Sequence, residues 1–280
     1  WARTRDNFKK DLERFYALGY SLIPLQSYLS ADIDLPKGVS PLVFTFDDGT
    51  AGQFRLVTDN SAEANGAIGA LENKVPDPLS AVGILLDFQE MHTEFGCAAT
   101  FYVNFPAPFG IQSEWVQKLQ MLLSYGMEIG NHTYNHKDLT NASADVIKAE
   151  IGSLSNAVFE AIGTKPLSLA LPYGGFPKQA QKEHLMIGEY EGLSYENAGV
   201  MLVGAEAALS PFNKAVNFAA IPRIRGSEDE LSKWLSYLDS SGKRYVSDGD
   251  ISIITVKAGS EADVSEAFIE DFEIVGLPQD

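Results

Sequence analysis

The sequence predicts an α/β fold in which parallel strands alternate with helices around a barrel. Two observations support this prediction. Short apolar or β-branched stretches recur along the chain, and stretches with helical periodicity separate them, which is typical of βαβ units. The chain also has 280 residues, a length that suits a single barrel domain. An open doubly wound sheet is the second choice at this point.

The first elements follow from local patterns. Apolar residues recur at helical spacing between positions 8 and 18, with Thr4 placed to cap the helix and Gly19 to end it. A buried strand is expected over 42–46. After it comes a stretch rich in Asn, Gly and Ala without steady periodicity, so we expect a long loop insertion over about 50–76.

The rest of the chain continues the same alternation, with no internal repeat and no linker, so we expect one domain over 1–280. Helix and strand signals come in turn along this part. The expected helices cover about 77–94, 113–126, 143–162, 177–186 and 227–238, and the expected strands cover 98–103, 127–130, 167–171, 198–204 and 251–256.

Charge and composition exclude several classes of partner. The chain has 38 acidic and 21 basic side chains, a formal charge of −17, which argues against binding to nucleic acid or anionic lipid. No apolar run approaches the ~20 residues that a membrane span requires. Cys97 is the only cysteine, so no intrachain disulfide can form, and we expect it in a buried strand. The oligomeric state is left open.

Reactive side chains are expected where the strands end, because both α/β architectures collect them at the carboxyl ends of their strands. Three stretches lie at such positions. They are "TFDDG" at 45–49, "EIGNHTYNH" at 128–136 and "LALPYGG" at 169–175.

Each motif alone has an ordinary structural explanation. Asp47 and Asp48 before a glycine also make a plain turn, and His132 and His136 also occur as a capping and a solvated histidine. Together they indicate a metal site. Asp48 and the two histidines would provide three ligands and leave a fourth position open, which is the pattern of a catalytic site. The cation would relieve the repulsion between the carboxylates and leave Asp47 beside it as a base.

With "TFDDG", "HTYNH" and "LPYG" in this order, the chain resembles the polysaccharide deacetylases of carbohydrate esterase family 4. The resemblance covers about 8–256. It implies a distorted (β/α) barrel and a hydrolase of carbon–nitrogen bonds other than peptide bonds. The implied reaction removes acetyl groups from an N-acetylated amino-sugar polysaccharide of the cell envelope or matrix. The implied cofactor is a divalent metal, zinc first, with cobalt or nickel as alternatives.

The resemblance also implies a role for each matching residue. Asp47 matches the catalytic base, and Asp48, His132 and His136 match the metal ligands. Tyr173 matches the residue whose backbone N–H helps to hold the oxyanion. The substrate class implies an extracellular or envelope-associated protein, with an export signal upstream of this chain.

The chain departs from the family pattern in two places. Ala170 stands where the family has an arginine that orients the base, and 251–259 lacks the late histidine that serves as general acid. We hypothesise that Arg223, in "AAIPRIRG", bonds Asp47 instead; a surface salt bridge is the alternative for this arginine. Some branches of the family resemble this chain and carry a histidine motif upstream. We therefore expect the general acid before Trp1, so that this stretch would bind metal yet catalyse poorly.

Two other functions stay open at this point. The same chemistry would remove O-acetyl groups from a polymer such as xylan, because the motifs do not distinguish an amide from an ester. Alternatively, Ala170 and the absent late histidine would suit a catalytically silent carbohydrate-binding homologue. The intact Asp47 argues against silence, since a binding site has no chemical need for a spare carboxylate.

Overall fold

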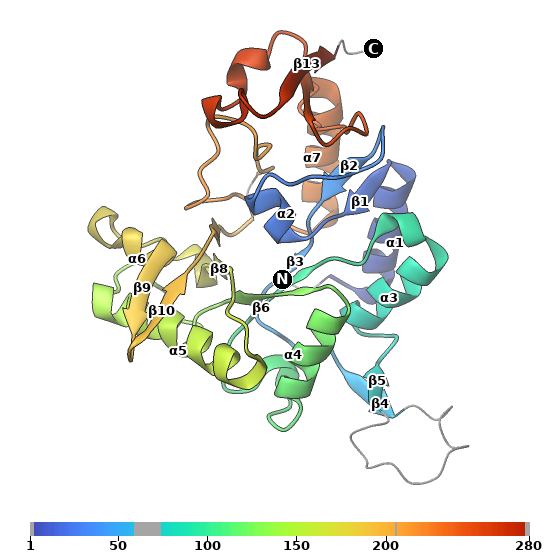
Figure 1. Ribbon diagram of the computed structural model, residues 1–280. Helices are drawn as coiled ribbons and strands as arrows, with labels where there is room; N and C mark the ends of the chain where they lie inside the picture. The colour runs from blue at the N-terminus through green and yellow to red at the C-terminus, as the bar shows by residue number, and fades with distance from the viewer. Residues whose placement is uncertain (1–2, 59–73, 205, 278–280) are drawn as a thin grey trace.

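The computed structural model describes residues 3–58, 74–204 and 206–277 and has an α/β fold around a curled parallel half-barrel sheet (Figure 1). The five strands lie in the order β11-β8-β7-β6-β3, and every pair in this sheet is parallel. The expected barrel of βαβ units is confirmed in this half-barrel form. The strands are β3 (Thr45–Phe46), β6 (Thr100–Val103), β7 (Glu128–Asn131), β8 (Ser168–Ala170) and β11 (Gly199–Met201).

Helices surround this sheet (Figure 1). Thr4 and Ser143 cap the first and fifth helices by accepting hydrogen bonds from backbone amides, as the sequence predicts, and Gly163 ends the fifth in a left-handed conformation. The helices are α1 (Arg5–Ala17), α2 (Leu25–Leu29), α3 (Ala81–Met91), α4 (Trp115–Ser124), α5 (Ala144–Ile162), α6 (Glu183–Met186) and α7 (Glu228–Ser241).

Three expected helices differ from the sequence prediction. The helix expected from residue 77 begins at Ala81, because Asp77 accepts a hydrogen bond from the Leu79 amide and forms a turn, so that Ser80 becomes the cap. The helix expected to be capped by Ser113 begins at Trp115. The helix expected over 177–186 is largely a short 3₁₀ turn followed by the single-turn α6.

In the part of the chain that the structure describes, four two-stranded pairs lie outside the main sheet. The strand expected over 42–46 is divided. Its first residue, Leu42, ends β2, which pairs with β1, and its last two residues form β3 in the main sheet. The strand expected over 251–256 pairs only with the final strand, and the β9–β10 hairpin was not predicted. The pairs are β1 (Tyr20–Leu22) with β2 (Ser40–Leu42), β4 (Leu56–Thr58) with β5 (Lys74–Pro76), β9 (Ile187–Tyr190) with β10 (Leu193–Glu196), and β12 (Ile253–Lys257) with β13 (Glu273–Leu277).

The insertion expected over about 50–76 contains the antiparallel β4–β5 pair, and its part at 59–73 lies outside the described residues. The β4–β5 pair lies at the opposite end of the molecule from the β12–β13 pair (Figure 1). None of the described helices combines the length and the apolar character needed to cross a membrane.

The main sheet is packed tightly where it supports the strand ends. Tyr102 on β6 is fully buried, and its hydroxyl lies 2.9 Å from the Ser168 hydroxyl on β8. The ring crosses β7 at Gly130, where an added Cβ would lie 2.2 Å from a ring carbon, so only glycine fits there. Cys97 is buried, as expected, but it lies in the loop before β6 and not in a strand.

All five strands point the same way, so their carboxyl ends lie along one edge of the sheet. The loops that follow β3, β7 and β8 carry the three motifs found in the sequence. A further parallel bridge pairs Met201 with Ile221, which brings 221–225 to the same edge. The fold therefore assembles four separate stretches of sequence at one place.

Candidate metal centre

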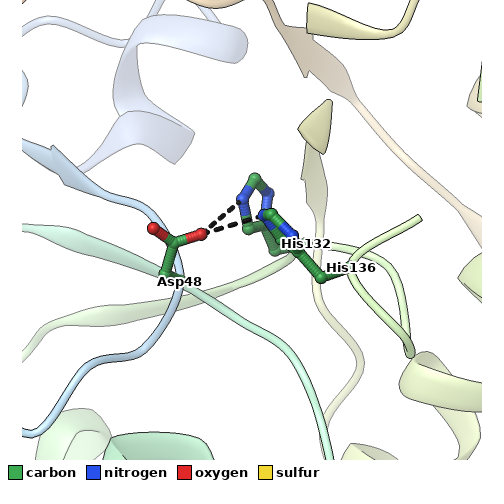
Figure 2. A group of neighbouring side chains, drawn as sticks. All are labelled: Asp48, His132 and His136. Atoms are coloured by element: carbon green, nitrogen blue, oxygen red, sulfur yellow. Dashed lines mark ion pairs between the residues drawn. The ribbon is translucent and has the colours of Figure 1, made fainter. Parts of the chain in front are cut away.

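Asp48, His132 and His136 converge at this edge (Figure 2). The Asp48 Oδ1 atom lies 3.3 Å from His132 Nε2 and 3.0 Å from His136 Nε2. All three ligand atoms lie within 4.8 Å of one another. Atoms bound to a tetrahedral zinc at ~2.1 Å lie about 3.4 Å apart, so these separations suit a single small cation.

Left-handed backbone conformations aim the ligands. Asp48 has φ 76° and Gly49 has φ 54°, so the chain turns directly after β3, as the sequence predicts from the glycine. Thr133 and His136 have φ 60° and 53°. Such values are uncommon for residues other than glycine and are concentrated at functional sites, which agrees with a site built from this loop.

The hydrogen bonding of His132 suits a cation at this position. Its Nδ1 lies 2.8 Å from the Ala170 carbonyl oxygen, which can only accept, so Nδ1 carries a hydrogen. In the neutral ring, Nε2 is then a lone pair that faces the Asp48 carboxylate at 3.3 Å. Two such acceptors repel unless a proton or a metal ion lies between them. The three residues could therefore bind a metal, and the donor set of two imidazoles and one carboxylate suits zinc.

His136 and Asp48 are held in the forms that bind a metal. Burial is the main cause that lowers the pKa of His136, which favours the neutral imidazole. The neighbouring His132 lowers the pKa of Asp48 more than burial raises it, so the carboxylate stays ionised. The Asp48 side chain is 53% exposed, which leaves the centre open to solvent on one side.

The loop that carries both histidines is tied to α5 by residues that sequence reasoning missed. Asn131 is fully buried and donates to the Ile151 carbonyl, at 2.9 Å. The buried Glu150 carboxylate accepts from the Asn135 backbone amide at 2.8 Å and from the Asn135 side chain at 2.9 Å. The Glu150 carbonyl accepts from the Tyr134 amide. These bonds fix the segment between the two ligand histidines.

Asp47 points to a different partner from Asp48. Arg223 binds it through two parallel hydrogen bonds, from Nη1 to Oδ1 and from Nη2 to Oδ2, each 2.8 Å long. The contact hypothesised from the sequence is therefore present, while its part in catalysis stays a prediction. Burial raises the pKa of Asp47, but the Arg223 charge and hydrogen bonds outweigh it and the net shift is downward.

Arg223 is itself held on several sides. Its Nε donates to the Leu202 carbonyl at 2.8 Å, and Nη1 also donates to Thr45 Oγ1 at 3.0 Å. The guanidinium carbon lies 5.7 Å from the centre of the Tyr102 ring. Ala170, where the family pattern has arginine, is fully buried and offers its carbonyl to His132 instead. The arginine thus comes from the stretch that pairs with β11 rather than from β8.

Tyr173 lies beside the ligands on a 3₁₀ turn over Pro172–Gly174, with φ 57°. Its hydroxyl lies 3.0 Å from His136 Nδ1. Within the described part of the chain, its backbone amide makes no hydrogen bond. The remaining histidines lie elsewhere: His92 packs against Tyr16 and Phe88 at the end of α3, and His184 lies on α6.

A family model described as polysaccharide deacetylase matches residues 89–188, the stretch that contains both ligand histidines and Tyr173. Over this stretch, about a third of the chain, the sequence is similar to polysaccharide deacetylases. A chitin deacetylase of Arthroderma benhamiae is 26% identical over 50% of this chain and 38% of its own length. The peptidoglycan-N-acetylglucosamine deacetylase PgdA of Listeria monocytogenes is 32% identical over 28% of this chain and 18% of its own length.

The chain spans well under half of the length of these curated relatives. Solved structures show the same fold over more of it. The Streptococcus pyogenes deacetylase PplD superposes with a TM-score of 0.55, at 16% identity, over 83% of this chain and 88% of its own. A polysaccharide deacetylase from Bacillus cereus gives the same TM-score at 15% identity, over 82% and 60%.

Metal binding by this centre should weaken at acid pH, because each protonated ligand loses its lone pair. The pKa of His136 lies below its ordinary value of 6.5, so protons compete for it only below that pH. Zinc affinity should therefore change little above about pH 7 and fall progressively toward pH 5. Calorimetric titration of the metal-free protein across this range measures it. Affinity that stays constant down to pH 5 would contradict the assignment of these ligands.

Proposed function

We propose that this chain is a metal-dependent hydrolase that removes acetyl groups from an N-acetylated amino-sugar polysaccharide. The observation that best supports it is the division of labour between the adjacent aspartates. Asp48 faces the two histidines, while Arg223 holds Asp47 apart with both oxygens engaged. A site built only to hold a metal would need the Asp48 carboxylate and would not need the Asp47 carboxylate.

The chain's own groups supply the rest of the chemistry. A divalent cation bound by Asp48, His132 and His136 would act as a Lewis acid on the acetyl carbonyl and lower the pKa of a bound water. Asp47 accepts the proton of the attacking water, since its lowered pKa keeps it ionised at neutral pH. Arg223 fixes the direction of its lone pairs.

The Tyr173 amide is the proposed donor to the tetrahedral oxyanion. It has no acceptor in the described part of the chain and lies on the turn beside His136. A donor of this kind is worth about 3 kcal/mol in the transition state. The departing amine also needs a proton. Neither His92 nor His184 lies at the site, so the upstream general acid expected from the sequence stays a prediction.

The substrate class rests on the relatives. Those named above are deacetylases of chitin and of peptidoglycan N-acetylglucosamine, both amino-sugar polymers. Such polymers lie in or outside the cell envelope, so we propose an envelope-associated or extracellular location. A one-domain organisation over 1–280 is part of the same proposal. The O-acetyl esterase alternative has no observation in its favour. The silent-homologue alternative has one, the lack of a third histidine at the site.

Acetate release tests the proposal directly. The zinc-loaded protein should release acetate from N-acetylglucosamine oligomers or from peptidoglycan, and Asp47→Asn should lower the rate by about 10²–10⁴-fold because the base is lost. The same variant should retain zinc, whereas Asp48→Asn should lose affinity. Acetylated xylan serves as the ester control. Bound zinc with no acetate from any of these polymers would contradict the enzymatic proposal.

Arg223 should matter through Asp47. Arg223→Ala should slow acetate release by roughly 10²-fold, because the Asp47 carboxylate is no longer held in position to take the proton of the attacking water. It should also move the acid limb of the pH–rate profile to higher pH, since the pKa of Asp47 rises when the cation is removed. Arg223→Lys keeps the charge but loses the paired bonds and should recover part of the rate. The exposed Arg5→Ala is the control. Rates for Arg223→Ala close to the wild type would overturn this role.

A further inference from the structure

The hydroxyl group of Tyr173 contacts a metal ligand, a role separate from that of the Tyr173 backbone amide. We propose that this hydroxyl is a positioning group for the metal: it accepts the Nδ1 hydrogen of His136 and so directs Nε2 to the cation. The inference rests on the proposed metal site and adds a residue that controls its affinity. Tyr173 is then a positioning residue through its side chain.

The contact is specific in distance and orientation. The Tyr173 oxygen lies 3.0 Å from His136 Nδ1, a normal hydrogen-bond length. The two rings meet edge to face, with their centres 4.6 Å apart and their planes at 67°. The opposite ring nitrogen, Nε2, lies 3.0 Å from Asp48 Oδ1. The imidazole is therefore held at both nitrogens, with the proposed cation position on the Asp48 side.

The two ligand histidines are supported in different ways. His132 bonds a carbonyl oxygen, which can only accept, so its Nε2 lone pair is fixed toward Asp48. His136 bonds a hydroxyl, which can donate or accept. Without metal, His136 can place its hydrogen on Nε2, where Asp48 accepts it, and Tyr173 then donates to Nδ1. Metal binding requires the other tautomer, and among the described residues the Tyr173 hydroxyl oxygen is positioned to accept the displaced hydrogen.

The exposure of Tyr173 separates this role from a role in folding. The residue is 73% exposed, so its hydroxyl adds little to the packing of the fold. The same residue carries the amide proposed for the oxyanion. A hydrogen bond between the Tyr173 side chain and His136 would therefore also keep that amide in register with the metal.

Zinc affinity of Tyr173→Phe tests the inference, because this change removes one oxygen and keeps both the ring and the backbone amide. We expect its zinc dissociation constant to rise about 10–100-fold, as for other residues that support metal-bound histidines. Competition with a chromogenic chelator measures it without any substrate. The visible absorption of the cobalt-loaded variant should also change, and the melting temperature of the metal-free protein should not.

Two further variants make the outcome decisive. Tyr237→Phe removes the hydroxyl of another exposed tyrosine, on α7, and should leave zinc affinity unchanged. His136→Ala should abolish tight binding. If Tyr173→Phe binds zinc within about twofold of the wild type while His136→Ala fails, the role of the hydroxyl is overturned and the metal site stands. If His136→Ala binds as well as the wild type, the metal site itself is wrong and this inference falls with it.

Discussion

The arrangement at the strand ends depends on one electrostatic constraint: with a neutral His132, acceptor atoms face one another with no hydrogen between them. The Ala170 carbonyl then holds the single N–H of this ring on its far side, so the near nitrogen and the Asp48 carboxylate both present lone pairs. A cation resolves this conflict, and the separations suit one small metal ion. The left-handed turn at Asp48 and the bonds from Glu150 to the histidine loop hold the ligands in this convergent arrangement.

The same constraint explains why two carboxylates can stand side by side at the end of a buried strand. Each has a different counter-charge. Arg223 neutralises Asp47 through two hydrogen bonds, and the proposed metal would neutralise Asp48. Removing either cation would leave a carboxylate partly buried and unpaired, which is costly. The aspartates are adjacent in sequence, yet they can have separate roles because the backbone turns at Asp48 and Gly49.

Sequence patterns predicted where the main-sheet strands lie along the chain and which residues are the candidate metal ligands, because periodicity, caps and closely spaced motifs are local signals. The Arg223 contact came from a family resemblance, since no local rule pairs residues 176 positions apart. Glu150 was missed because a carboxylate on a helix gives no sign of what it faces. The β9–β10 hairpin had a usable signal in the sequence, the glycine at position 192. Glu191 and Gly192 form the turn of this hairpin, and both have positive φ. The division of the strand over 42–46 depends on which neighbour each half meets, which only the assembled fold decides.

The central claim is that a metal ion binds between Asp48, His132 and His136 while Arg223 holds Asp47 beside it. Anomalous diffraction at the zinc edge, from crystals grown with zinc, tests it most directly. The account predicts one strong peak at about 2.0–2.2 Å from Asp48 Oδ1 and from Nε2 of both histidines, with the paired Arg223–Asp47 bonds intact. No peak there, or a peak that takes Asp47 as a ligand in place of its bond to Arg223, would contradict it.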